Sequence, residues 1–394
     1  MDQPTPASLT KPPVAITLTV PLCPARCGFC DLPLGCGDAS SAANREAYAR
    51  ALMAEIDTAT PDLAAYEVAA VRIAGGAANH LGGAVLNQLM GFLADCAAVP
   101  DGCEVSLACV PTGLNIGIFE HLQRRWDLRL EIEYATSEAF LHQGLGRWFP
   151  VGAVHDAAEV ACASRRRNFD LNVLYGLEGQ GVPSLRASID TAAKLGATHI
   201  TLKPLRLTPG TTVAAAYQRF LDEKPSSPRK AFPDENKRRE LYDAGIERLR
   251  ELGYVRYTQH HFALEGYRAR YLELACSAAA TMGFGAGGSS RYGGVTCSNA
   301  TDLAHYLKGS GDFRSIMASS ATIGEEDEAR ERLVRGLYAI AGIDTASLPD
   351  FPGRANLLAK LKAEGFLGQT GSRAFLTAEG GFNWEAVSAR IRRP

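Results

Sequence analysis

Residues 21–30 read PLCPARCGFC, and they place Cys23, Cys27 and Cys30 in one short loop, separated by three and then two residues. A structural zinc ion needs four protein ligands, so these three thiolates alone leave it one ligand short. They suffice to hold three irons of a four-iron cluster and leave the fourth iron open to another molecule. The loop therefore predicts an iron–sulfur centre on these three cysteines. A zinc site completed by Cys36 or a histidine is the alternative.

Strand-like and helix-like segments alternate along the chain up to about residue 210. Short β-branched and apolar runs predict strands over residues 15–20, 68–74, 104–110, 128–134, 169–175 and 199–204. Apolar residues at helical spacing predict helices over residues 45–58, 85–98, 138–145, 184–195 and, further on, 236–252. This alternation is typical of βαβ units around a parallel sheet. About six units are too few for a closed eight-stranded barrel, so we expect an α/β fold with a partial (β/α)6 barrel.

Three regions are expected from changes in pattern. Residues 1–14 are proline-rich and predict a loose N-terminal arm, and residues 15–315 form the barrel with its extension. Within that extension, residues 283–294 (GFGAGGSSRYGG) predict a glycine-rich loop. Residues 316–394 predict a small winged-helix-like α+β domain with helices over 325–340 and 354–364 and a hairpin over 366–377.

Composition excludes several classes of protein. Hydrophobic residues make up 46% of the chain and charged residues 21%, which is normal for a folded globular protein. The net charge of −2 gives no electrostatic basis for binding nucleic acid. No apolar run reaches the roughly 18 residues that a membrane span needs, and the N-terminus has no secretory signal pattern. We therefore expect a cytoplasmic enzyme with no nucleic-acid or membrane partner.

The cysteine loop resembles the signature of the radical S-adenosylmethionine (radical SAM) superfamily, in which an aromatic residue, here Phe29, precedes the last cysteine. From about residue 15 to 380 the chain is similar to one subgroup, the oxygen-independent coproporphyrinogen III oxidase-like proteins. Besides the loop, the segments that carry the similarity are residues 129–147, 169–180, 207–211, 253–257, 262–267 and 283–294.

The resemblance implies a 4Fe–4S cluster on Cys23, Cys27 and Cys30, and S-adenosylmethionine (SAM) on the open iron. It further implies that the AGGAA stretch at 74–78, with Gly75 and Gly76, lies along the methionine part of SAM. Glycine allows such a close approach because it has no Cβ. Arg147 and Asn172 fall where the subgroup places polar contacts to SAM. A solvent-exposed Arg147 and a purely structural Asn172 are the alternatives.

Several positions depart from the subgroup. A tyrosine and a histidine before the loop are replaced by Thr17 and Thr19, a carboxylate by Ala108 and a glutamine by Ala135. Each departure removes a polar contact to SAM, so we expect replacements such as Glu131 or Glu133.

The haem-chaperone branch of the subgroup carries a His-Asn-x-x-Tyr-Trp motif. The matching positions, residues 271–276, read YLELAC. The candidate haem ligand is therefore absent, and tight haem binding is not expected. The pair His260 and His261 either lines the active site, which makes these residues the candidate catalytic groups, or closes a strand end. Cys36 is either an additional redox thiol or an ordinary loop cysteine.

Retention of the cluster loop and loss of the haem-specific residues favour one functional interpretation. The chain resembles class C radical SAM methyltransferases and cyclopropanating enzymes, which transfer methyl or methylene groups to sp2 carbons of natural products. Such an enzyme would bind two SAM molecules, the second near Gly285 and Gly287. Its partners would be a small-molecule substrate and an electron donor such as flavodoxin or ferredoxin. The alternatives are a tetrapyrrole enzyme or haem chaperone, and another radical SAM rearrangement or hydrogen abstraction on a small metabolite.

Overall fold

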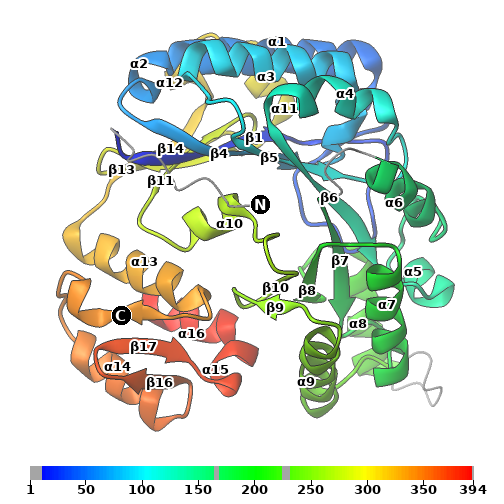
Figure 1. Ribbon diagram of the computed structural model, residues 1–394, viewed down its shortest axis with the longest axis vertical. Coiled ribbons are helices and arrows are strands. Elements are labelled where there is room, and N and C mark those ends of the chain that lie inside the picture. Colours follow the sequence, from blue (N-terminus) through cyan, green and yellow to red (C-terminus); the bar gives the residue numbers. More distant parts are fainter. Residues whose placement is uncertain (1–10, 164–167, 224–230, 393–394) are drawn as a thin grey trace.

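The computed structural model describes residues 11–163, 168–223 and 231–392, and its central feature is a curved sheet (Figure 1). Within these ranges twelve strands form one sheet. Six of them lie next to one another in the sheet in the order in which they occur along the chain, and each is parallel to the next. These six are β1 (Pro13–Val20), β4 (Glu67–Gly75), β5 (Glu104–Cys109), β6 (Asp127–Ala135), β7 (Phe169–Tyr175) and β8 (His199–Pro204). The predicted strands and the partial α/β barrel are thus confirmed.

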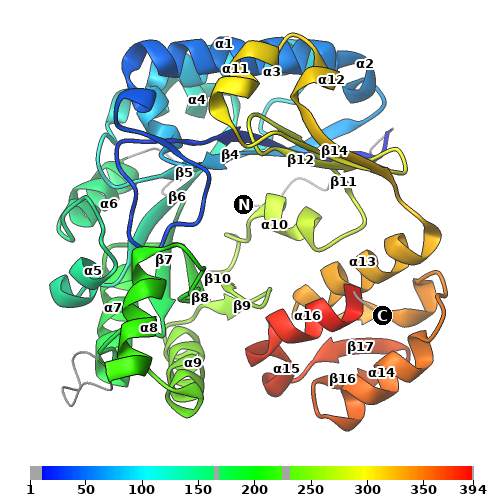
Figure 2. The ribbon, with the colours of Figure 1, turned by 180° about the vertical axis from the view of Figure 1, so that it is seen from behind.

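Helices cover the outer face of the sheet. They are α1 (Ala42–Thr58), α3 (Gly83–Ala97), α4 (Ile116–Arg125), α5 (Ala139–Gly144), α6 (Ala153–Ala163), α7 (Val182–Lys194), α8 (Thr212–Glu223) and α9 (Glu235–Glu251). The predicted helices agree to within a few residues, whereas α4, α6 and α8 were not predicted. Seen from both sides, α1, α3 and α4 lie outside the curve of the sheet, and α10 (Arg270–Ala275) lies inside it (Figures 1 and 2).

Alternate residues of β6 face opposite sides of the sheet, as the two-residue period of a strand requires. One set is apolar and packs in the main core: Leu128, Leu130 and Ile132. The other set is charged and lines cavities within the barrel: Arg129, Glu131 and Glu133. Strand β8 follows the same rule with His199, Thr201 and Lys203 on the inner side. The inside of this barrel is therefore polar.

Short strands extend the sheet at both edges. Strand β11 (Ala280–Phe284) pairs in parallel with β1, and β12 (Ser289–Tyr292), β13 (Val295–Asn299) and β14 (Met317–Thr322) continue antiparallel. At the other edge, β10 (His261–Ala263) and β9 (Val255–Arg256) follow β8 in antiparallel order. The prediction of a glycine-rich loop over 283–294 is wrong in part, because half of this segment belongs to β11 and β12.

The glycines of that segment serve close packing between strands. A Cβ on Gly283 would lie 2.4 Å from the carbonyl oxygen of Ser289. A Cβ on Gly285, whose φ is +97°, would lie 2.3 Å from the carbonyl oxygen of Thr19. The Gly285 N–H donates to the buried carboxylate of Glu55 on α1, at 2.7 Å. The turn between β11 and β12 is thus tied to the end of β1 and to α1.

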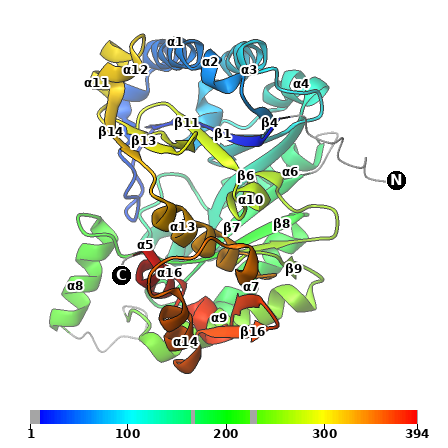
Figure 3. The same cartoon turned by 90° about the vertical axis from the view of Figure 1, so that its left-hand side faces the viewer.

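A separate apolar core lies in the C-terminal segment, below the strand β14 that leads into it (Figure 3). Its elements are α13 (Glu325–Tyr338), β15 (Ile343–Asp344), α14 (Arg354–Ala363), β16 (Leu367–Thr370), β17 (Arg373–Leu376), α15 (Ala378–Phe382) and α16 (Trp384–Arg392). The predicted hairpin is formed by β16 and β17. The exact domain limits stay a prediction.

The predicted arm over 1–14 lies outside the described residues up to position 10, and β1 already begins at Pro13. In the part of the chain that the structure describes, no helix is both long and apolar enough to cross a membrane.

Candidate cofactor site

The cysteine loop is fixed to the barrel by backbone hydrogen bonds. Cys23 ends β2 (Leu22–Cys23), which pairs in parallel with β3 (Gly35–Cys36), so that Cys23 lies opposite Cys36. The Gly28 N–H donates to the carbonyl of Leu145 at 2.9 Å. Within the loop, the Arg26 guanidinium donates to the carbonyl of Leu32 at 2.6 Å. These contacts hold the loop in place without a metal ion.

The end of β4 touches the same loop. The Ala77 N–H donates to the carbonyl of Leu22 at 2.8 Å. A Cβ on Gly76 would lie 2.4 Å from that same carbonyl oxygen, and Gly75 has a φ of +123°. Both positions therefore require glycine, because a side chain would push the loop away or strain the backbone. Gly75 and Gly76 bring the strand end and the cysteine loop together around one cavity.

That cavity has a volume of about 410 Å³. Its walls include the residues predicted from the sequence: Cys23, Cys27, Phe29, Cys30, Gly75, Gly76 and Arg147. All three cysteines are free thiols. Among the described residues, no group of three or more His, Cys, Asp or Glu side chains converges on one point where a metal ion could sit. In a four-iron cluster each thiolate binds a different iron, so its ligands do not converge on one atom.

Arg147 lies between the loop and the strand ends. Its side chain is only 4% exposed, and its Nη2 donates to the Glu133 carboxylate at 2.7 Å. Its Nη1 lies 3.7 Å from the Cys27 Sγ, and its guanidinium stacks on Phe29 at 4.7 Å and on Phe149 at 5.2 Å. The Nε is buried without a hydrogen-bond partner. A solvent-exposed Arg147 is thus ruled out, and the cation faces the thiols.

The thiols and this cation fit an iron–sulfur cluster. Burial raises the pKa of the Cys23 thiol to about 11, so without metal it is protonated at neutral pH. Iron binds the thiolate, so loading the site displaces that proton. A cluster carrying several thiolates is an anion, which the buried Arg147 guanidinium stabilises. The unpartnered Nε of Arg147 leaves a hydrogen-bond donor beside the cysteine loop. Gly75 and Gly76 leave open space there, because they have no side chains.

Asn172 and the two candidate replacement carboxylates occupy different positions. The Asn172 Nδ2 donates to Glu133 at 3.3 Å, so Asn172, Glu133 and Arg147 form one cluster. Glu131 is taken by a bidentate pair with Arg72, at 2.9 Å from Nε and 2.5 Å from Nη2. Burial opposes ionisation, but the Arg72 guanidinium holds the pKa of the Glu131 carboxyl below its usual value. Of the two candidates, Glu133 is the one beside the loop.

The positions that depart from the subgroup differ in what surrounds them. Ala108 lines the cavity and offers only a methyl group. The Thr17 hydroxyl is hydrogen-bonded to the Tyr271 hydroxyl at 2.6 Å, and the Thr19 carbonyl accepts from Tyr48 at 2.6 Å. Ala135 is fully buried at a β-bulge with a φ of +79°, in an apolar cluster. Thr17, Thr19 and Ala135 are therefore engaged in packing or internal hydrogen bonds.

Two further predictions concern the histidine pair and the glycines of a second SAM site, and none of these four residues lines the cavity of the cysteine loop. His261 lines an inner cavity of the barrel, but His260 packs its ring against Tyr338 of α13. Gly285 is held by Glu55, and the Gly287 N–H donates to the carbonyl of Ala300 at 3.0 Å. Neither glycine lies at the cavity of the cysteine loop. The expected second SAM site therefore gains no support from their placement.

The sequence reasoning missed five ionisable residues inside the barrel: Arg72, Arg129, Asp170, His199 and Lys203. Alternation along the strands was the available signal, because polar residues at every second position of a βαβ strand must face away from the helices.

The comparisons with known proteins agree with this architecture. No protein-family model matches the chain. The chain is similar to the Heme chaperone HemW of Bacillus subtilis, with 23% identity over 368 residues, which cover 92% of this chain and 94% of that protein. It is also similar to the oxygen-independent coproporphyrinogen III oxidase of Cereibacter sphaeroides, with 24% identity over 359 residues, or 85% and 75% of the two chains.

Among solved structures, the chain matches coproporphyrinogen III oxidase from Escherichia coli, described as a radical SAM enzyme, with a TM-score of 0.81. The sequence identity is 17%, and the match covers 97% of this chain and 91% of that one. The fold is therefore that of the radical SAM superfamily. Within that superfamily it is the coproporphyrinogen oxidase-like form. The expected resemblance to class C methyltransferases is not supported over this one.

Proposed function

We propose that the protein is a radical SAM enzyme that acts on a tetrapyrrole. Cys23, Cys27 and Cys30 would hold a 4Fe–4S cluster, with SAM bound against Gly75 and Gly76. When bound, the cluster supplies the electron that cleaves SAM to a 5′-deoxyadenosyl radical. The observation that carries this proposal is the meeting of three free thiols, two obligatory glycines and a buried arginine in one cavity.

The chain's own residues have distinct tasks in this proposal. Arg147 neutralises the thiolates and, through its unpartnered Nε, offers a donor to the carboxylate of SAM. One oxygen of the Glu133 carboxylate fixes the orientation of Arg147. The other oxygen accepts a hydrogen bond from Asn172. Phe29 stacks on the Arg147 guanidinium and so covers one face of it beside the cysteine loop. Shielding and placement are what a protein contributes when the cofactor carries the reaction.

The tetrapyrrole substrate is proposed from the names of the similar proteins, which cover most of the chain. Methyl transfer to a natural product, our first expectation, has no such support. A haem chaperone is the second candidate because a relative of nearly the same length carries that name. Tyr271 occupies the position of the histidine in the chaperone motif. Its hydroxyl is hydrogen-bonded to the Thr17 hydroxyl, and its side chain packs against the barrel strands. This placement favours the enzyme over the chaperone.

One anaerobic experiment tests the proposal. The reconstituted protein is reduced and supplied with SAM, with and without coproporphyrinogen III, and 5′-deoxyadenosine is measured. We expect about four irons per chain and 5′-deoxyadenosine formation that rises with the substrate. Absence of iron uptake would refute the radical SAM assignment. Haem titration, with a shifted Soret band at one haem per chain, would support the chaperone instead. The electron donor, a flavodoxin or ferredoxin, and the cytoplasmic location stay predictions.

A further inference from the structure

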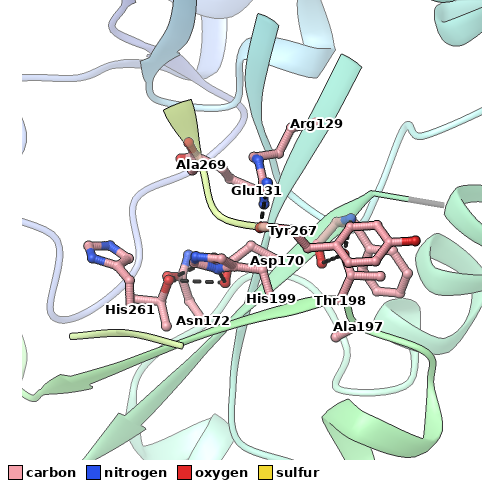
Figure 4. Close-up of polar contacts among 12 residues, drawn as sticks. Arg129, Glu131, Asp170, Asn172, Ala197, Thr198, His199, His261, Tyr267 and Ala269 are labelled. Carbon is pink, nitrogen blue, oxygen red and sulfur yellow. Dashed lines mark hydrogen bonds and ion pairs between the residues drawn. The ribbon is translucent and has the colours of Figure 1, made fainter. Parts of the chain in front are cut away.

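A smaller chamber continues inward from the cavity of the cysteine loop. It has a volume of about 90 Å³ and shares four wall residues with the larger cavity: Arg72, Ala108, Glu133 and Lys203. Its deeper walls are formed by Arg129, Asp170, His199 and His261, together with residues next to and within α10 (Figure 4). A volume of about 30 Å³ per water means that the chamber admits about three waters or one small polar group.

Arg129 is the distinctive residue of this chamber. Its side chain is 2% exposed, and only Nη2 makes a hydrogen bond, to the carbonyl of Tyr267 at 2.7 Å (Figure 4). Its Nε and Nη1 are buried without any hydrogen-bond partner. A buried donor without an acceptor costs about 1–3 kcal/mol, and more when it is charged. Such a guanidinium has donors available to an oxygen acceptor that enters the chamber.

The carboxylates nearby do not meet this need. Glu104 lies 3.6 Å from the Arg129 Nε, but its two oxygens accept the backbone N–H groups of Arg270 and Tyr271, at 2.9 and 3.0 Å. Glu131 is paired with Arg72. Glu104 therefore forms a loose ion pair with Arg129, and no described residue accepts a hydrogen bond from the Arg129 Nε or Nη1.

Asp170 is committed as well. It receives hydrogen bonds from the His199 Nδ1 at 2.6 Å and from the Thr201 hydroxyl at 2.9 and 3.0 Å. At the mouth of the chamber, Lys203 forms no hydrogen bond or ion pair with any described residue and so adds a second cation. On the chamber walls the charges of Arg72, Arg129 and Lys203 are balanced by those of Glu131, Glu133 and Asp170. What the chamber offers an incoming group is therefore the unpartnered donors of Arg129 and the ammonium group of Lys203.

We infer that this chamber binds a carboxylate on an arm of the substrate. A planar carboxylate matches the fork of N–H groups on a guanidinium, and a group of this size fits a volume of about 90 Å³. Because the chamber shares four wall residues with the larger cavity, the rest of the substrate would lie there, near the cysteine loop. The inference rests on the proposed function and assigns Arg129 and Lys203 to substrate binding.

Binding of trifluoroacetate to the cluster-loaded protein, measured as broadening of its 19F NMR signal, tests the inference. Trifluoroethanol is the neutral probe of similar size. We expect the wild-type protein to broaden the trifluoroacetate signal and not the alcohol signal. Arg129→Gln should weaken trifluoroacetate binding at least tenfold, and Lys203→Met several-fold. Arg186→Gln, which removes a surface ion pair with Glu247 on the outer side of the barrel, is the matched control and should bind like wild type.

Two results would overturn the inference. One is equal broadening in wild type and Arg129→Gln, or none in wild type, which means that the chamber holds only water. The other is loss of binding in Arg147→Gln but not in Arg129→Gln, which places the anion in the larger cavity. If Arg129→Gln does not fold, Arg129→Lys keeps the charge without the fork and should still bind more weakly than wild type. Iron content and SAM cleavage in wild type report separately on the proposed function.

Discussion

Replacing Arg147 with methionine tests the candidate cofactor site most directly. Methionine keeps much of the side-chain length and removes the charge. The substitution deletes the hydrogen bond to Glu133, and since Glu133 is 39% exposed, the lower end of the range for charged hydrogen bonds, about 1.5 kcal/mol, applies. It also deletes stacking on Phe29 and Phe149, each about 0.5–1 kcal/mol. The free energy of unfolding should therefore fall by about 2.5–3.5 kcal/mol.

The larger effect should be on SAM. Loss of a charge-assisted hydrogen bond to a bound carboxylate costs about 1–3 kcal/mol, which is roughly 5- to 150-fold in the dissociation constant. Equilibrium dialysis with labelled SAM measures it under anaerobic conditions, and iron analysis shows whether the cluster is retained. Arg186→Met is the control. Unchanged SAM affinity in a folded, cluster-loaded Arg147→Met protein would refute the role given to this arginine.

Three further predictions concern the loop and the frame around it. Cys27→Ala should abolish uptake of a four-iron cluster and its broad visible absorption, and retention of both would contradict the ligand assignment. Gly76→Ala should lower the free energy of unfolding by about 2–3 kcal/mol in thermal melts, because its Cβ would meet the carbonyl of Leu22 at 2.4 Å. Glu55→Gln should cost about 2 kcal/mol, since Gly285 and Tyr306 donate to one carboxylate oxygen and Asn299 to the other, so an amide turns one of these donors against an NH2 group; an unchanged melting temperature would count against this role.

The barrel strands were predictable from the sequence because each buries one face under helices and so carries a local apolar pattern. The cysteine loop was predictable because its ligands are adjacent in the chain. The short edge strands were not, since β9 and β10 contain few residues and are defined by pairing with β8. The pattern of 283–294 misled for the same reason: glycine marks both loops and close strand packing, and only the partner strand distinguishes them.

The candidate site was predicted where motifs are contiguous and missed where they are dispersed. Arg147 and Asn172 were placed by resemblance, and the structure brings them together through Glu133. Arg129 and Lys203 lie on different strands, β6 and β8, so no spacing along the chain relates them. Their proximity depends on strand order and register, which the sequence expresses only as a polar residue at every second position.

The shared wall between the two cavities has a kinetic consequence. A group that enters from the larger cavity reaches Arg129 by passing Arg72, Ala108, Glu133 and Lys203, and α10 with the segment before it lines the chamber at its other end. An arm must therefore enter before the outer space is filled, and it can leave only after that space has emptied. Binding would follow a compulsory order, in which the molecule that reaches deepest arrives first and departs last.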